Sequence, residues 1–258
     1  MKALVTGAGA RLGQAMALYL GQRGYDVAVH YAGSAYGAAD TVVQLQAMGR
    51  NAAALQADLL EEEATQALVA RAADALGGPL TCLINNASIF EYDTLASATS
   101  QSWDRHINSN LRAPFVLTQQ FAEQAPAAAV DDAGETLATG LVINMLDQRV
   151  HKLTPEFMTY TIAKMGLWAF TQTAAQALAP RIRVNGIGPG PTLQGHRQTA
   201  DHFDRQRAAT ILERGANKSD IVAALGFFLD SPAVTGQMIS VDGGQHLGWK
   251  TPDVLGVE

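Results

Sequence analysis

The sequence ALVTGAGARLGQAMALYL at residues 3–20 joins a short apolar run to a glycine-rich turn and then to a helical pattern. The apolar run at residues 3–6 predicts a strand. After the turn, apolar side chains recur every three or four residues, which predicts a helix whose buried face carries Leu12, Ala15, Met16, Tyr19 and Leu20. A glycine loop between a strand and a helix N-terminus lets a pyrophosphate approach the backbone amides. The segment therefore predicts a dinucleotide-binding site.

The rest of the chain repeats this alternation of short apolar runs and longer helical patterns, without a linker rich in proline, glycine or serine. The pattern predicts an α/β fold with a doubly wound parallel sheet of seven strands, in a single domain over residues 1–258. Strands are expected at residues 3–6, 26–30, 52–56, 82–85, 141–145, 183–187 and 238–241. Further helices are expected at residues 38–48, 61–76, 102–124, 157–178 and 220–229.

The composition is that of a globular protein, with 48% hydrophobic and 16% charged residues. The net charge is −6 and no stretch is dense in lysine or arginine, which argues against a nucleic-acid partner. No apolar stretch approaches the roughly 18 residues of a membrane span, and the N-terminus lacks the pattern of a signal peptide. The single cysteine, Cys82, has apolar neighbours and is expected to be reduced and buried. We therefore expect a cytoplasmic protein.

Two segments interrupt the alternation. Residues 124–140 are small, polar and acidic, which predicts a surface loop. Residues 188–215 follow the sixth expected strand, and a long loop at that end of a parallel strand is typical of a substrate lid. A disordered surface insertion is the alternative. Four side chains of this segment are candidates for substrate contact, namely His196, Arg197, His202 and Phe203.

The end of the second expected strand indicates which nucleotide is bound. In NAD sites an acidic residue commonly follows this strand and accepts a hydrogen bond from the ribose 2′-hydroxyl. Here the strand ends in His30-Tyr31-Ala32-Gly33-Ser34, without a carboxylate that would repel a 2′-phosphate. Ser34 can donate a hydrogen bond to that phosphate and Arg11 can supply the opposing charge, so the sequence predicts NADP(H). A solvated Arg11 at the helix start is the alternative.

Two further patterns are candidates for binding and proton transfer. Asp58 follows the third strand and either accepts from the adenine amino group or caps the next helix. Tyr160 and Lys164 lie four residues apart and so project from one helix face. A tyrosine with a pKa of about 10 is a poor acid–base group at neutral pH, and a nearby ammonium favours its ionised form. We therefore expect Lys164 to lower the pKa of Tyr160 and also to hold the nicotinamide ribose.

Taken together, these motifs resemble the short-chain dehydrogenase/reductase superfamily over nearly the whole chain. The resemblance is carried by the loop at residues 6–13, the segment Asn85-Asn86-Ala87, the Tyr160/Lys164 pair, Pro189-Gly190 and the run Val241-Asp242-Gly243-Gly244. It implies a Rossmann-type sheet in the order 3-2-1-4-5-6-7, hydride transfer with a nicotinamide cofactor, and a homotetramer. It also implies that Tyr160 and Lys164 are the catalytic pair. Asn110 would match the asparagine that holds a water of the proton relay.

Two departures from the common family pattern resemble the pteridine reductases and dihydromonapterin reductases. Arg11 stands where glycine is common, and Asp147 stands thirteen residues before Tyr160, where most members carry serine. The subgroup resemblance extends to the segments Ala10-Arg11-Leu12-Gly13, His30-Tyr31, Asn86-Ala87-Ser88-Ile89-Phe90, Asn144-Met145-Leu146-Asp147 and Gly186-Ile187-Gly188-Pro189-Gly190. Trypanosomatid members carry an arginine where Gly33 stands, so phosphate binding here is expected to depend more on Arg11.

The chemistry of Asp147 supports the same interpretation. When hydride adds to a ketone, negative charge grows on oxygen, which a serine hydroxyl stabilises and a carboxylate repels. When hydride adds to a C=N bond, nitrogen gains a proton and the activated ring is cationic, so a carboxylate can stabilise it or, once protonated, pass on a proton. Asp147 therefore favours reduction of a heterocycle such as a pterin. An acid that merely caps a helix in an unusual carbonyl reductase is the alternative.

Phe90 and Ser88 follow the fourth expected strand. A flat pterin ring can stack between the nicotinamide and the Phe90 ring, and Ser88 can bind the pterin or a cofactor phosphate. A core position under the lid is the alternative for Phe90. The other histidines, His106, His151, His196, His202 and His246, lack the spacing of metal ligands, so no metal is predicted.

The sequence thus predicts a reductase of a dihydromonapterin- or dihydrobiopterin-type pterin, with activity on dihydrofolate as an extension. A ketone reductase, such as a 3-oxoacyl-carrier-protein reductase, and a non-catalytic NADP-sensing protein are the alternatives. The candidate catalytic residues are Asp147, Tyr160, Lys164 and Asn110. The candidate substrate residues are Ser88, Phe90, Asp147 and Tyr160. The candidate cofactor residues are Gly7, Arg11, Leu12, His30, Tyr31, Ser34, Asp58, Leu59, Asn86, Ala87, Ser88, Tyr160, Lys164, Pro189 and Gly190.

Overall fold

A parallel sheet of seven strands lies at the centre of the computed structural model, which describes residues 1–195 and 198–251. Its order is β3-β2-β1-β4-β7-β8-β9. The strands are β1 (Lys2–Val5), β2 (Asp26–Tyr31), β3 (Ala52–Gln56), β4 (Cys82–Asn85), β7 (Gly140–Met145), β8 (Ile182–Pro189) and β9 (Met238–Val241). Numbered within the sheet alone, the order is 3-2-1-4-5-6-7, so the predicted fold class is confirmed. Each predicted strand is present, with ends that differ by at most two residues.

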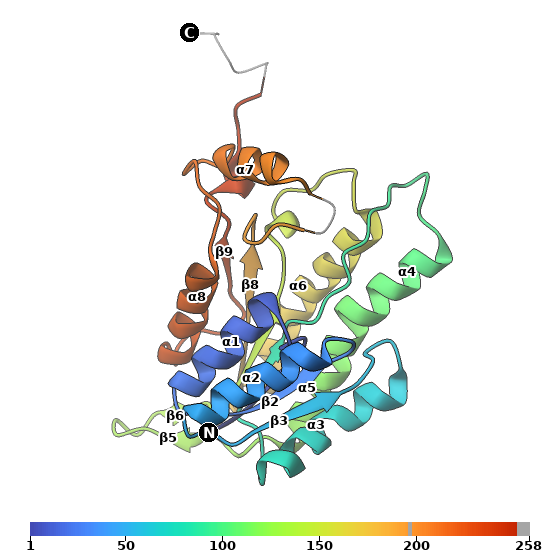
Figure 1. Ribbon diagram of the computed structural model, residues 1–258. Coiled ribbons are helices and arrows are strands. Elements are labelled where there is room, and N and C mark those ends of the chain that lie inside the picture. The colour runs from blue at the N-terminus through green and yellow to red at the C-terminus, as the bar shows by residue number, and fades with distance from the viewer. Residues whose placement is uncertain (196–197, 252–258) are drawn as a thin grey trace.

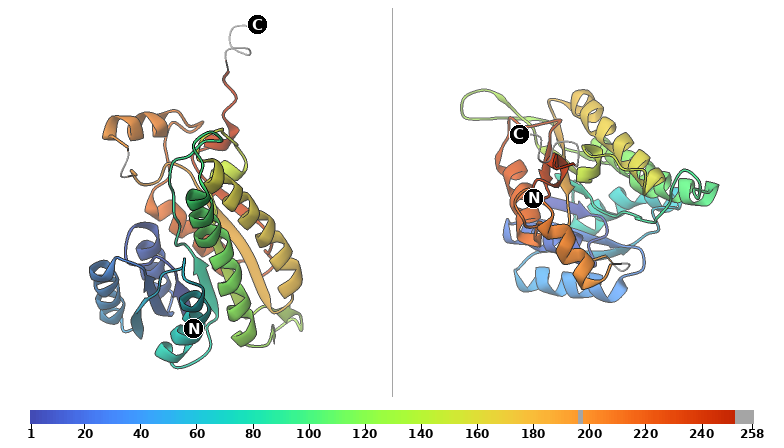
Figure 2. Two further views of the ribbon diagram at one scale, coloured as in Figure 1. Left: turned by 90° about the vertical axis from the view of Figure 1, so that its right-hand side faces the viewer. Right: turned by 90° about the horizontal axis from the view of Figure 1, so that it is seen from above.

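Helices cover both faces of the sheet (Figures 1 and 2). One face is packed by α1 (Arg11–Gln22), α2 (Ala35–Ala47) and α8 (Lys218–Asp230), and the other by α3 (Glu62–Leu76), α5 (Ala113–Gln124) and α6 (Met158–Leu178). A hydrophobic core lies on each face of the sheet, and alternate strand residues pack into one or the other. Val5 packs with α1 and α8, whereas Leu4 packs with α3 and α5. Burial on both sides explains why the strands read as continuous apolar runs.

The helix expected at residues 102–124 is interrupted. It consists of α4 (Ser100–Ile107), a π-helical turn η1 (Asn108–Arg112) and then α5. The start of α4 is fixed by a capping box between Thr99 and Ser102. Single π-helical turns inside longer helices often occur at functional sites, and this one contains Asn110.

Both segments expected to be loops contain regular structure. Residues 124–140 include an antiparallel hairpin of β5 (Ala129–Val130) and β6 (Thr136–Leu137), closed by the Asp131 carboxylate, which accepts from the backbone amides of Ala133 and Glu135. Residues 188–215 include α7 (Ala200–Ala208), which begins at the capping residue Thr199. The two segments lie at opposite ends of the molecule (Figures 1 and 2). The polarity of the two segments predicted that they are exposed, but it did not predict the β5–β6 hairpin or helix α7.

Helix α7 lies at the carboxyl end of the sheet, toward which β8 points (Figure 1). Two 3₁₀ turns, η2 (Gln148–Val150) and η3 (Gln245–Leu247), follow β7 and β9 at the same end. His196 and Arg197 lie outside the described residues. None of the helices in the described ranges has both the length and the apolar character that crossing a membrane requires.

Candidate active site

A cleft of about 1270 Å³ opens at the carboxyl ends of the strands, where ligands bind in open parallel sheets. All the candidate cofactor residues line it, as do Ser88, Phe90, Asp147 and Tyr160, although the chain places them on segments as distant as the glycine loop and the end of β8. Asn110 does not line the cleft. His202 and Phe203 of α7 line it from above, together with Gln206. The sequence analysis missed Gln148, Arg149, Phe157 and Gln245, which lie on the same walls.

The glycine loop forms a narrow cradle in which Gly7, Gly9 and Gly13 have no room for a side chain. Gly7 has a φ of +63°, and a Cβ placed on Gly13 would lie 2.2 Å from the Gly7 carbonyl oxygen. The Asn86 side-chain amide donates to the carbonyl oxygens of Thr6 at 2.8 Å and Gly7 at 3.2 Å, which fastens β4 to the loop. This narrow cradle before the N-terminus of α1 fits the pyrophosphate of a dinucleotide.

The buried His30 side chain supports the glycine loop through a hydrogen bond to Gly7. Its side chain is 1% exposed; its Nδ1 accepts from the Gly7 amide at 3.1 Å, and its Nε2 lies 3.0 Å from the Ala57 carbonyl oxygen. Because the Gly7 amide is a donor and the carbonyl is an acceptor, the ring is neutral and carries its proton on Nε2. Burial lowers the pKa of His30 to about 4, so the ring stays neutral at physiological pH. The sequence analysis placed His30 at the cofactor but missed this hydrogen bond.

The Arg11 side chain joins the glycine loop to the segment after β8. Arg11 has a φ of +55°, and its guanidinium donates to the carbonyl oxygens of Gln194 at 3.0 Å and Leu193 at 3.2 Å. Arg11 is thus an exposed residue at the start of α1 whose guanidinium is held by two backbone carbonyl oxygens. On the other side of the loop, Gly9 packs against Ser34, where α2 begins.

Asp58 belongs to the turn that leads into α3. Its Oδ1 accepts from the Leu60 amide at 3.0 Å, and its carbonyl oxygen accepts from the Glu61 amide. The residue at the N-cap of α3 is Glu61, so Asp58 is not the helix cap that the sequence offered as an alternative. Asp58 lines the nucleotide end of the cleft.

Tyr160, Asp147 and Lys164 meet at the centre of the cleft. The Tyr160 hydroxyl, from α6, donates to Asp147 Oδ2 at 2.9 Å. The other carboxylate oxygen, Oδ1, accepts from the Arg149 amide at 2.8 Å and caps η2. Lys164 Nζ donates to the Met145 carbonyl oxygen at 2.7 Å and lies 5.6 Å from the centre of the Tyr160 ring. Asp147 is thus both a cap and a partner of Tyr160.

The electrostatics of this centre differ from the prediction that Lys164 brings Tyr160 toward ionisation. Burial and the adjacent Asp147 carboxylate raise the pKa of Tyr160 well above its usual range. Burial also raises the pKa of Asp147, against the opposing effects of the Arg149 amide and guanidinium. Burial lowers the pKa of Lys164 to about 8. Tyr160 therefore holds its proton at neutral pH.

Aromatic side chains form one wall beside this centre. The Phe90 ring stacks on Phe157 with centroids 4.3 Å apart, and meets Tyr160 edge-on at 4.7 Å. Tyr92 packs edge-on against Phe157, and the Arg149 guanidinium lies 5.0 Å above the Phe157 ring. Phe90 is 47% exposed, so it is not the core residue that the sequence offered as an alternative.

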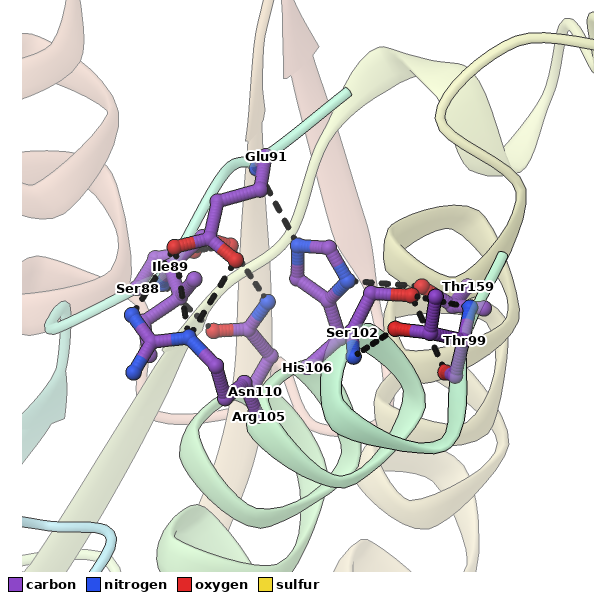
Figure 3. A network of polar contacts seen from close by, with 9 residues as sticks. All are labelled: Ser88, Ile89, Glu91, Thr99, Ser102, Arg105, His106, Asn110 and Thr159. Carbon is purple, nitrogen blue, oxygen red and sulfur yellow. Dashed lines mark hydrogen bonds and ion pairs between the residues drawn. The ribbon is translucent and has the colours of Figure 1, made fainter. Parts of the chain in front are cut away.

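Asn110 and Ser88 lie close to this wall. The Asn110 side-chain amide both accepts from the Ile89 amide at 2.8 Å and donates to the Ile89 carbonyl oxygen at 2.7 Å (Figure 3). This amide therefore holds the chain directly before Phe90, a contact that the sequence analysis did not anticipate. The Ser88 side chain partly offsets the rise in the pKa of Tyr160.

Two of the remaining histidines, His246 and His106, contact polar side chains. His246 Nδ1 lies 2.7 Å from the Asp242 carboxylate, and its ring is 5.6 Å from that of His151. His106 is fully buried against Thr159. Within residues 1–195 and 198–251, no group of three or more His, Cys, Asp or Glu side chains is arranged to hold a metal ion.

The comparisons with known proteins agree on the protein family. A family model for short chain dehydrogenase matches residues 1–204. FolM alternative dihydrofolate reductase 1 from Brucella canis, crystallised with NADP, is 40% identical with a TM-score of 0.90, covering 98% of this chain and 96% of that one. A short chain dehydrogenase from Burkholderia cenocepacia in complex with NADP is 31% identical with a TM-score of 0.84, covering 94% and 96%. The 3-oxoacyl-(acyl-carrier-protein) reductase FabG of Staphylococcus aureus is 31% identical over 250 residues, 95% of this chain and 98% of the relative.

Proposed function

The chain belongs to the short-chain dehydrogenase family, and from this premise we propose that it is an NADPH-dependent reductase of a C=N bond in a dihydropterin. The observation that carries the proposal is the Asp147 carboxylate, which faces the cleft and accepts from the Tyr160 hydroxyl at 2.9 Å. Most members of the family are expected to carry serine at this position. A carboxylate there suits a ring nitrogen that becomes cationic, and it opposes the anionic oxygen of a ketone.

NADP(H) is the cofactor that we propose for the cleft. The glycine cradle fits a pyrophosphate, Ser34 and Arg11 are the candidates for a 2′-phosphate, and Asp58 is the candidate for the adenine amino group. The related structures from Brucella canis and Burkholderia cenocepacia, both with NADP, support this choice. When bound, NADPH supplies the hydride that reduces the carbon of the C=N bond.

Tyr160 and Asp147 supply the proton for the nitrogen of that bond. The raised pKa of Tyr160 keeps its hydroxyl protonated, so it gives this proton to the ring nitrogen as hydride adds to the carbon, and a proton from solvent then restores the hydroxyl. The raised pKa of Asp147 lets its carboxyl group take up that solvent proton and pass it to Tyr160. The Tyr160–Asp147 pair therefore acts as one donor, with apparent pKa values that belong to both groups. Lys164 uses one of its three donors on Met145 and keeps two for the ribose and for charge on Tyr160.

Phe90 and Ser88 are the residues that we propose to orient the pterin. A half-exposed phenyl ring beside Tyr160 offers a flat apolar surface for a heterocycle, and Ser88 offers a hydrogen bond at its edge. The segment at residues 188–215, with His202 and Phe203 over the cleft, is the proposed lid. Asn110 stays the candidate for the relay water. A cytoplasmic homotetramer completes the proposal, and light scattering after size-exclusion chromatography tests the assembly.

A matched pair of substrates tests the function. We expect the protein to oxidise NADPH with a 7,8-dihydropterin and to show little turnover of a β-keto thioester. The similarity to FabG of Staphylococcus aureus is the observation that favours ketone reduction as the second candidate. Turnover of the thioester alone would establish that second candidate and eliminate the pterin reductase.

Replacing Arg11 tests the choice of nucleotide. Arg11→Ala is expected to raise KM for NADPH about tenfold, because a charge-assisted hydrogen bond to a phosphate is lost. KM for NADH, which lacks the 2′-phosphate, should change much less. Steady-state kinetics with both nucleotides measures the difference, and Arg50→Ala, in the turn after α2, is a control with the same loss of charge outside the cleft. An equal loss for both nucleotides would show that Arg11 does not contact the 2′-phosphate.

A further inference from the structure

The backbone on both sides of Phe90 is held by side chains of one helical segment. On one side, the Asn110 amide bonds both backbone groups of Ile89. On the other side, His106 Nε2 accepts from the Glu91 amide at 3.1 Å (Figure 3). Phe90 lies between the two attachments, so the direction of its ring depends on both.

The His106 ring has a defined protonation state in this arrangement. Nε2 faces a backbone N–H and must accept, so the proton of the neutral ring lies on Nδ1. Nδ1 then donates to Thr159 Oγ1 at 2.7 Å, and the Thr159 hydroxyl donates to Asp93 Oδ2. All three side chains are at most 2% exposed. The chain of hydrogen bonds thus runs from the Glu91 amide through His106 and Thr159 to Asp93, with each donor facing an acceptor. Thr159 is the residue directly before Tyr160.

We propose that His106 is a positioning residue whose neutral ring holds Phe90 against the substrate, so that acidification weakens substrate binding. The proposal rests on the proposed function, because it takes Phe90 as the surface that the pterin ring contacts. His106 itself lies away from the cleft, behind the Phe90 segment. Its effect is therefore expected on substrate affinity, with the proton-transfer step left intact.

Protonation of His106 breaks the attachment to Glu91. A charged ring carries N–H on both nitrogens, so Nε2 and the Glu91 amide become two donors facing each other. The charged groups around the ring are Asp93 and Glu91 from the Phe90 segment and Arg105 from α4, with Tyr160 of α6 in edge-on ring contact at 5.9 Å. Burial lowers the pKa of His106 below its usual 6.5, despite the two carboxylates. The attachment is therefore intact above pH 6.5 and is lost as the pH falls through the lowered value.

The Arg105–Glu91 ion pair limits how far the segment can move. The guanidinium binds the Glu91 carboxylate through Nε and a terminal nitrogen, the shorter contact being 2.8 Å. Loss of the His106 bond is therefore expected to loosen the backbone at Glu91 without detaching the segment. A loss of one hydrogen bond corresponds to an increase of about three- to tenfold in KM.

Two substitutions separate the contacts of His106. His106→Gln places an amide near the position of Nε2, so it keeps an acceptor for Glu91 and does not titrate. His106→Asn places its amide near Nδ1, so it keeps the Thr159 contact and loses Glu91. We expect KM for dihydropterin to rise about three- to tenfold below pH 6.5 in the wild type, to stay flat in His106→Gln, and to be high at every pH in His106→Asn. A rise in KM that persists in His106→Gln overturns the proposal.

Hydrogen exchange at the Glu91 amide provides a readout without substrate. Well above pH 6.5, we expect protection of this amide, corrected for its intrinsic rate, in the wild type and in His106→Gln, and about a tenfold loss of protection in His106→Asn. An unprotected Glu91 amide in the wild type overturns the proposed contact. If dihydropterin is not reduced at all, the proposed function fails, and the exchange experiment still decides the role of His106.

Discussion

A Tyr160→Phe enzyme is expected to reduce dihydropterin about a thousandfold more slowly than the wild type, within the range for loss of a general acid. The substitution removes the hydroxyl that donates to Asp147 at 2.9 Å and keeps the ring that packs against Phe90. KM for NADPH should change far less than kcat, because the variant loses only the hydroxyl of Tyr160 and keeps its ring, Lys164 and the glycine cradle. Steady-state and single-turnover measurements of NADPH oxidation give kcat and the rate of the chemical step.

Tyr92→Phe is the matched control for this variant. Tyr92 lines the same cleft, and its hydroxyl contacts Glu156 at 3.4 Å, away from Asp147. Removing that hydroxyl should leave kcat almost unchanged. If both variants were equally active, or if Tyr160→Phe kept most of its turnover, another group would have to deliver the proton.

The second large effect is expected for Asp147→Ser, which should lower kcat for dihydropterin about a hundredfold. Serine removes the negative charge and the proton carrier, but it is a good capping residue and can still accept from the Arg149 amide. The variant therefore separates the chemical role of Asp147 from its role as a cap. Turnover of dihydropterin and of a β-keto thioester, measured together, reports both activities.

The binding of NADPH serves as the control for Asp147→Ser. Fluorescence titration should give the same Kd as for the wild type, since Asp147 is not among the candidate cofactor residues. A rise in Kd together with the fall in kcat would indicate a damaged cleft. Undiminished pterin turnover would leave Asp147 with a structural role only, and the specificity argued from its charge would be lost.

The architecture could be predicted from the sequence because strands that are buried on both faces of a sheet consist almost entirely of apolar residues. Each sheet strand is a short apolar run, and the parallel topology places the carboxyl ends of all strands at one edge. That rule alone brings Gly7, Ser88 and Asp147 to the same cleft. The ends of elements, the interruption at η1 and the β5–β6 hairpin depend on a few hydrogen bonds and leave no comparable periodic signal.

The parts of the site that escaped prediction depend on contacts between distant segments. His106 looked like an isolated histidine, yet its partners are the Glu91 amide and the Thr159 hydroxyl, 53 residues further along the chain. Arg11 reaches across more than 180 residues to Gln194. The pKa of Tyr160 was misjudged because the local pattern showed the nearby lysine but neither the burial of the hydroxyl nor the Asp147 carboxylate beside it, which together raise that pKa.

The two oxygens of Asp147 have an evolutionary consequence. One oxygen satisfies a backbone amide that a capping serine hydroxyl can also satisfy, so exchanging the two residue types is expected to leave the fold undisturbed. The other oxygen accepts from Tyr160, and under the proposed function the same exchange is expected to alter which substrates are reduced. If the proposed function holds, a lineage built on this scaffold is therefore free to move between oxygen and nitrogen acceptors at a single codon, without first having to tolerate a less stable protein.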